Sequence, residues 1–244
     1  MIENMRSSMS RKLPLVTVCK PHNLMMSIAG GGPSLEDTAK HLDGYVAAVN
    51  GSLRFLLSKP MPLPYLCGVM DPGEHISDAI DADENVRYYV ASICHPRIFD
   101  KLKGCDVRLW HATPASIGDE DGVRNTLSGS GAGWLAIGGG CTMGLRWLNL
   151  GYILGFRSFD LHGLDSSFRS GRTHAYPDRA DSKDHITIDG RETRLNFLAQ
   201  VRDFFAVMEM FKSLDKINVR VFGDGLLQDV VRSKNADLLC EAGK

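Results

Sequence analysis

The sequence has no excess of charge of either sign. It holds 28 lysines and arginines against 29 aspartates and glutamates, a formal net charge of −1. Nucleic acids and anionic membrane surfaces are bound through clustered positive charge, so the composition supports neither partner. Long apolar runs are also missing, because polar residues or glycine interrupt them well short of the ~18 residues of a membrane span. Residues 1–12 lack the apolar centre of a signal peptide, which makes the cytoplasm the expected location.

Short motifs that would fix a reaction class are absent as well. Six cysteines are scattered without a C-x-x-C pair, and the histidines show no zinc-ligand spacing. This favours reduced core thiols over disulfides or a zinc site. There is no G-x-S-x-G segment of a serine hydrolase, no G-x-G-x-x-G, and no Gly-Lys-Ser/Thr of a P-loop.

Short apolar runs alternate with helical patterns after about residue 20. The runs that predict strands are 24–29, 45–49, 65–70, 86–93, 106–110, 157–161 and 217–222. The clearest helical patterns are 34–41, 141–156 and 193–214. Strands that alternate with helices predict an α/β, Rossmann-like fold, with a mostly parallel sheet covered by helices on both faces.

No internal repeat or strong linker divides the chain. We expect residues 1–20 to be a poorly ordered lead-in and residues 21–244 to form a single nucleotide-binding domain. The apolar stripe of 193–214 is typical of core packing, and its alternative is a contact with a second copy of the chain.

The first glycine cluster is the most informative stretch. Gly30, Gly31 and Gly32 follow an apolar run, and Pro33 and Ser34 then suit the start of a helix. Glycine permits a close ligand approach, and a helix N-terminus offers N–H groups to an anion. The order of strand, glycine turn and helix therefore predicts a nucleotide phosphate site, with a plain strand-to-helix turn as the alternative.

A second glycine cluster repeats the pattern. Residues 134–137 are apolar, Gly138, Gly139 and Gly140 follow, and Thr142 stands at the start of the helical pattern 141–156. Backbone N–H groups and the Thr142 hydroxyl can bind a second anion. Close helix packing is the alternative reason for these small residues.

Polar residues follow several of the expected strands. Because the carboxyl ends of parallel strands share one edge of a sheet, these residues should converge there. Asn50, Asp71 and Asp165 are among them. Asp71 and Asp165 can hold Mg²⁺ or bind a ribose or base edge, while a turn or cap role is the alternative for both.

The segment 166–191 is rich in cationic and imidazole groups. His174 and His185 can act as general base toward an acceptor hydroxyl, and the arginines can clamp phosphates or carboxylates. The cations are Arg169, Arg172, Arg179 and Lys183. A solvated surface loop is the alternative.

These motifs together resemble a known family. Gly30-Gly31-Gly32-Pro33-Ser34-Leu35 looks like the G-x-G-P-S-L opening of the MptE-like 6-hydroxymethylpterin diphosphokinase family, and is similar to bacterial sialyltransferases related to the motility-associated flagellin glycosylation factors. Further matches in order are Asn50, Asp71-Pro72, the stretch 139–156, Leu161-His162-Gly163-Leu164-Asp165 and His174-Ala175-Tyr176. Gly31 departs from the asparagine that the sialyltransferases prefer, and His185 is only a loose counterpart of their histidine base.

The resemblance implies a Rossmann-like nucleotide-dependent transferase. Our main hypothesis is Mg²⁺-dependent diphosphoryl transfer from ATP or another nucleoside triphosphate to a small hydroxyl acceptor. One alternative is a glycosyltransferase that uses a nucleotide-activated sugar, such as a CMP-linked acidic sugar, and a sugar acceptor. The other is a nucleotide- or glycan-binding module without catalysis.

Overall fold

The computed structural model describes residues 1–60, 66–113, 120–128, 135–177, 185–214 and 216–233. Within them, eight parallel strands form one sheet in the order β10-β7-β1-β2-β3-β4-β5-β6. The strands are β1 Met25–Ala29, β2 Tyr45–Val49, β3 Leu66–Val69, β4 Arg87–Ala91, β5 Asp106–Ala112, β6 Ala136–Ile137, β7 Ser158–His162 and β10 Asn218–Val221. The α/β, Rossmann-like prediction is confirmed.

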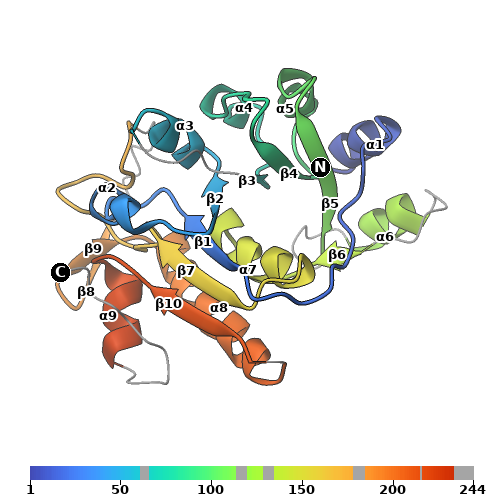
Figure 1. Ribbon diagram of the computed structural model, residues 1–244. Helices are drawn as coiled ribbons and strands as arrows, with labels where there is room; N and C mark the ends of the chain where they lie inside the picture. Colours follow the sequence, from blue (N-terminus) through green and yellow to red (C-terminus); the bar gives the residue numbers. More distant parts are fainter. Residues whose placement is uncertain (61–65, 114–119, 129–134, 178–184, 215, 234–244) are drawn as a thin grey trace.

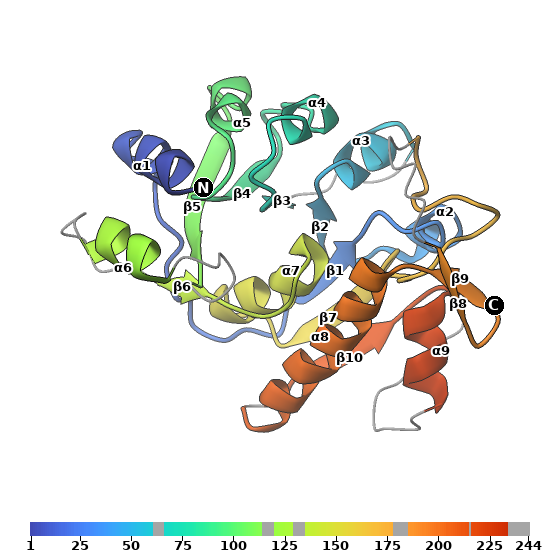
Figure 2. The same cartoon turned by 180° about the vertical axis from the view of Figure 1, so that it is seen from behind.

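Helices cover both faces of this sheet (Figures 1 and 2). They are α1 Ile2–Ser10, α2 Leu35–Thr38 with η1 Ala39–His41, α3 Ser52–Leu57, α4 Ile76–Ala79, α5 Pro96–Lys101, α6 Glu120–Ser128, α7 Met143–Ile153, α8 Leu195–Lys212 and α9 Leu226–Ser233. From β1 to β5 each new strand is added on the same side of the previous one. Because such parallel connections are right-handed, α2 to α5 lie on one face of the sheet. The chain then reverses through α7 to β7, so α7 lies on the other face and packs against α8.

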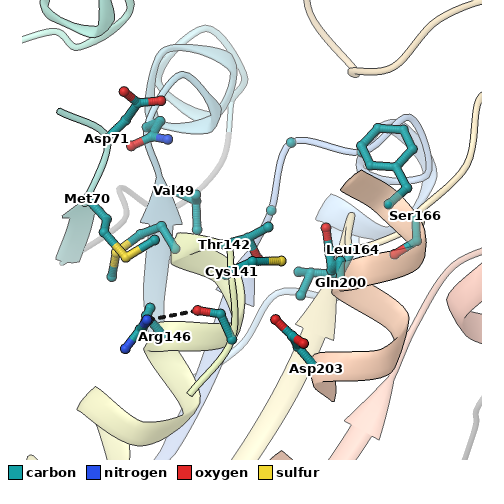
Figure 3. Close-up of a pocket in the computed structure, with 18 of the residues that line it drawn as sticks. Val49, Met70, Asp71, Cys141, Thr142, Arg146, Leu164, Ser166, Gln200 and Asp203 are labelled. Atoms are coloured by element: carbon teal, nitrogen blue, oxygen red, sulfur yellow. Dashed lines mark hydrogen bonds between the residues drawn. The ribbon is translucent and has the colours of Figure 1, made fainter. Parts of the chain in front are cut away.

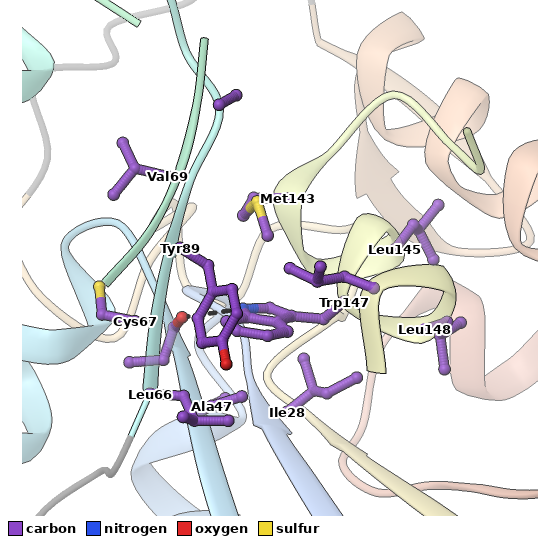
Figure 4. Packing of buried hydrophobic residues seen from close by; sticks show 14 of the residues in the cluster. Ile28, Ala47, Leu66, Cys67, Val69, Tyr89, Met143, Leu145, Trp147 and Leu148 are labelled. Atoms are coloured by element: carbon purple, nitrogen blue, oxygen red, sulfur yellow. Dashed lines mark hydrogen bonds between the residues drawn. The ribbon is translucent and has the colours of Figure 1, made fainter. Parts of the chain in front are cut away.

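The core is centred between α7 and the middle strands (Figure 4). Trp147 of α7 is fully buried, stacks edge-on against Tyr89 with ring centroids 5.3 Å apart, and donates its indole N–H to the Ala48 carbonyl at 3.1 Å. Gly68 in β3 makes room for this indole, since a Cβ there would lie 2.6 Å from Trp147 Nε1. This contact fixes α7, and with it the turn that precedes α7, against the sheet.

Three local features were not predicted. Residues 2–10 form α1, in which Met5 is fully buried and Asn4 donates to the Ile93 carbonyl at 2.9 Å. A small antiparallel sheet, β8 Ile186–Ile188 and β9 Arg191–Thr193, lies at the end of the cationic segment. Cys19 and Cys141 are exposed rather than in the core, where Cys67 and Cys94 lie. The division into a lead-in and one domain stays a prediction.

Within the described part of the chain, none of the helices combines the length and hydropathy that a membrane span requires.

Candidate functional site

A cavity of about 780 Å³ lies at the carboxyl end of the sheet. It adjoins the point where the chain order reverses, because β1 and β7 are neighbours, and such switch points are where open α/β sheets bind ligands. The lining contains most of the predicted site residues: Gly30, Gly31, Gly32, Asn50, Asp71, Gly139, Gly140, Thr142, Asp165 and His174. Pro33, Ser34 and His185 do not line it. Figure 3 shows part of this cavity.

The first glycine turn uses its N–H groups within the protein. Gly30 donates to the His162 carbonyl at 2.8 Å, and Gly32 donates to the Gly163 carbonyl at 2.7 Å. The Ser34 N–H, at the start of α2, donates to Oδ2 of Asp165 at 2.7 Å. A carboxylate of this chain therefore fills the anion position at the N-terminus of α2.

Asp165 is enclosed around this contact. It is 3% exposed, its Oδ1 accepts the Ser34 hydroxyl, and a Cβ at Gly32 would lie 2.7 Å from Oδ2. Burial raises the pKa of Asp165 to about 6, although both hydrogen bonds from Ser34 act in the opposite direction. The arrangement makes Asp165 a support for the turn, with little carboxylate surface left for a ligand.

The second glycine turn is held by its carbonyls instead. Gly139 and Gly140 have φ values of +96° and +89°, which side chains rarely adopt. Arg146 donates from Nε to the Gly140 carbonyl at 2.9 Å, and Asn149 donates to the Gly138 carbonyl at 2.9 Å. The turn is thus anchored from α7.

The N-terminus of α7 faces the cavity. Thr142 caps the helix, since its hydroxyl accepts the Leu145 N–H at 3.4 Å. Met143 and Gly144 also line the cavity, and among the described residues nothing accepts their N–H groups. These donors, together with the dipole of an eleven-residue helix, form a site suited to a phosphate.

Asn50 and Asp71 lie at the ends of β2 and β3. Asn50 has a φ of +46° and donates its N–H to the Gly68 carbonyl at 3.1 Å, and its buried Oδ1 has no hydrogen-bond partner among the described residues. Asp71 accepts the Gly73 N–H on Oδ1 at 2.7 Å, the pattern of an Asx turn. Both residues line the cavity, and Figure 3 shows Asp71 near Met70.

The magnesium hypothesis does not fit these carboxylates. Both Asp165 oxygens are engaged by Ser34, so Asp71 would be the main remaining ligand. Within the described residues, no group of three or more histidine, cysteine, aspartate or glutamate side chains is arranged to hold a metal. We therefore assign no step to Mg²⁺.

The two predicted histidines have separated positions. His174 lines the cavity, its Nδ1 lies 2.9 Å from the Thr173 hydroxyl, and the neighbouring Ala175 N–H donates to the Gly31 carbonyl at 2.9 Å. His185 instead contacts Glu192 through Nδ1 and packs on Phe168 outside the cavity lining. Of the two, only His174 is placed to meet a ligand in this cavity.

The predicted arginine clamps point to the acidic start of α2. Arg172 makes a bidentate pair with Glu36 at 2.9 and 3.0 Å, and Arg169 pairs with Asp37 at 2.5 Å. The Arg172 hydrogen bond holds the pKa of Glu36 below its usual value. Arg179 and Lys183 lie outside the described residues.

The sequence analysis missed the contribution of α8. Its Phe197, Gln200 and Asp203, spaced three residues apart, line the cavity, and Arg194 does so just before the helix. One signal was available, because Gln200 interrupts the apolar stripe four residues before the fully buried Phe204.

No family model matches the chain, and no curated protein matches it in sequence. Among solved structures, the MAf glycosyltransferase from Magnetospirillum magneticum AMB-1 superposes on 92% of this chain with a TM-score of 0.65 at 14% identity. This chain spans 37% of that protein, and the likeness establishes a shared fold. The sialyltransferase CstII from Campylobacter jejuni, in complex with the substrate analogue cytidine-5'-monophosphate, matches at 14% identity over 82% of this chain and 80% of that one, with a TM-score of 0.43. The second likeness is too distant to support structural conclusions.

Proposed function

We propose that the chain transfers a glycosyl group from a nucleotide-activated sugar to a hydroxyl acceptor. The observation that carries this proposal is the N-terminus of α7, where Met143 and Gly144 line the cavity and no described residue accepts their N–H groups. A nucleotide leaves such a reaction as an anion, so fixed N–H donors at its phosphate stabilise the charge that develops in the transition state.

His174 is the proposed general base. The Thr173 hydroxyl, 2.9 Å from Nδ1, orients the imidazole, which can take up the acceptor's proton. The acceptor oxygen then bonds to the anomeric carbon, the bond from that carbon to the phosphate oxygen breaks, and the electron pair leaves with the nucleotide. His185 has no part in this scheme, because it does not line the cavity.

The fold neighbour also favours this class of reaction. MAf is a glycosyltransferase and shares the fold of nearly the whole chain. Diphosphoryl transfer from ATP, the main hypothesis from the sequence, would rely on metal neutralisation of the phosphates. The engagement of Asp165 by Ser34 leaves that hypothesis with Asp71 as the main predicted metal ligand.

The test places a charge at the phosphate site without removing the helix cap. Thr142→Asp and Thr142→Asn both retain a side-chain oxygen that caps α7, and they differ by one negative charge. Calorimetry with CMP, UMP, GMP and AMP measures the nucleotide affinity. For the nucleotide that binds best, we expect Thr142→Asp to lower the affinity at least tenfold and Thr142→Asn to lower it less than threefold.

Turnover is then measured with CMP-, UDP- and GDP-linked sugars and a mixture of methyl glycosides. If the rate of donor consumption falls at least a hundredfold in His174→Asn while the nucleotide affinity is unchanged, the result supports His174 as the general base. Equal nucleotide affinity in Thr142→Asp and Thr142→Asn contradicts the phosphate site. Nucleotide binding without turnover of any donor favours the non-catalytic module, and Mg²⁺-dependent turnover of ATP favours diphosphoryl transfer.

A further inference from the structure

The α8 wall of the cavity carries polar groups that the proposed transfer does not use. Gln200 and Asp203 lie one turn apart and both line the cavity. Gln200 is 8% exposed and lines the cavity, and within the described part of the chain its side-chain amide forms no hydrogen bond. Its donor and acceptor are therefore available to a ligand that enters the cavity.

Gln200 and Asp203 lie on the opposite side of the proposed phosphate site from the proposed base, His174. Figure 3 shows Cys141 and Thr142 between Val49 and Asp71 on one side and Gln200 and Asp203 on the other.

His174 belongs to the Asn50 side of the cavity. Its ring packs against Tyr176 with centroids 5.1 Å apart, and a Cβ at Gly51, the residue after Asn50, would lie 3.0 Å from the Tyr176 ring. A nucleotide whose phosphate sits at α7 directs the transferred group toward His174, which leaves the α8 wall for the nucleoside.

The side chains of Gln200 and Asp203 have complementary hydrogen-bonding capacities. The Gln200 amide can donate, while a carboxylate such as Asp203 only accepts. The exposed Arg202 guanidinium donates to Oδ1 of Asp203 from Nη2 at 2.9 Å and from Nε at 3.1 Å, and the Cys141 thiol also contacts this carboxylate. Cytosine and adenine both present an amino donor beside a ring-nitrogen acceptor, whereas uracil and hypoxanthine present a carbonyl beside a ring N–H.

We propose that Gln200 and Asp203 select a nucleobase with an exocyclic amino group, which donates to Asp203 while Gln200 donates to the adjacent ring nitrogen. The inference rests on the proposed function, since it requires a nucleotide in this cavity. A carbonyl in place of the amine would face the carboxylate of Asp203 and be repelled.

Matched nucleotides test the selection, because CMP and UMP, like AMP and IMP, differ mainly by an amine against a carbonyl. Calorimetry on the full chain should show at least one amino nucleotide binding tenfold tighter than its carbonyl partner. Asp203→Asn adds a donor that a carbonyl can accept, so it should reduce that ratio to threefold or less. Glu209→Gln, the same change on an exposed part of α8, is the control and should leave the ratio unchanged.

Gln200 is tested with two variants, Gln200→Met and the isosteric Gln200→Glu, each checked for an unchanged unfolding temperature. Both variants should lower the affinity for the preferred amino nucleotide at least fivefold. Equal affinities within both nucleotide pairs in the parent chain, or a ratio unaffected by Asp203→Asn, would overturn the base selection and leave the phosphate site intact. Binding of none of these four nucleotides, nor of GMP, would overturn the proposed function as well.

Discussion

The two glycine turns of this chain share a local pattern and differ in what meets the helix that follows. In the first, Asp165 approaches from 131 residues away and accepts the Ser34 N–H at the start of α2. In the second, Arg146 and Asn149 hold the turn by its carbonyls, and no described residue accepts the N–H groups of Met143 and Gly144, which line the cavity. The same local pattern therefore leaves the helix N-terminus occupied by a carboxylate in the first turn and available for the proposed phosphate in the second.

The largest expected effect comes from removing that carboxylate. Asp165→Ala leaves the buried Ser34 N–H and hydroxyl without their acceptor, so we expect a loss of about 3 kcal/mol in the free energy of unfolding. Asp165→Asn, which keeps an acceptor oxygen, should lose about 1 kcal/mol. Urea unfolding measures both, and equal losses in the two variants would mean that Ser34 does not depend on this acceptor.

The second glycine turn is tested by a substitution that strains its backbone. At Gly139, with a φ of +96°, a methyl group is strained and also collides with Asn149, so Gly139→Ala should cost about 2 kcal/mol. Gly138 is the matched control, because its added Cβ would be 3.4 Å from the nearest atom, Thr113 Cγ2. A Gly138→Ala variant as unstable as Gly139→Ala would contradict the role assigned to the positive φ.

The stability of the first turn should depend on pH through Asp165. Its pKa of about 6 in the folded chain is above the ordinary 3.8, so the folded state binds the proton more tightly. The resulting stabilisation is fully present below pH 4 and is lost as the pH rises through 6. Relative to Asp165→Asn, the parent chain should therefore be about 1.4 kcal/mol more stable at pH 5 than at pH 8. The test is urea unfolding of both chains at the two pH values, and a constant difference between them would show that Asp165 does not titrate in this range.

Much of the fold follows from local sequence. Tyr45–Val49 was predicted with the bounds that the structure shows, and the remaining strands of the sheet except β6 overlap predicted runs, because parallel strands buried on both faces are continuous apolar segments. The convergence of strand-end residues also follows, since the topology brings Asn50, Asp71 and Gly139 to one edge.

What could not be predicted depends on contacts between distant segments. Nothing near Ser34 indicates that Asp165 accepts its N–H, and nothing near Arg172 indicates that Glu36 pairs with it. Gln200 reaches the cavity only because α8 packs on α7, a contact between helices separated by β7 and the β8-β9 sheet.

The smallest expected effect concerns the loop arginines. Their guanidinium groups lie on Glu36 and Asp37 of α2, beside the turn that Asp165 fills rather than at the N-terminus of α7. Exposed ion pairs of this kind contribute little to stability, so the double variant Arg169→Ala, Arg172→Ala should fold normally. It should also change the affinity for the best-bound nucleotide less than twofold, in contrast to the tenfold loss expected for Thr142→Asp. Calorimetry at low and at physiological salt measures this. A tenfold loss of nucleotide affinity in the double variant would show that the arginines move from Glu36 and Asp37 to bind the phosphates. The region of the first glycine turn would then contribute to the anion site as well as the second.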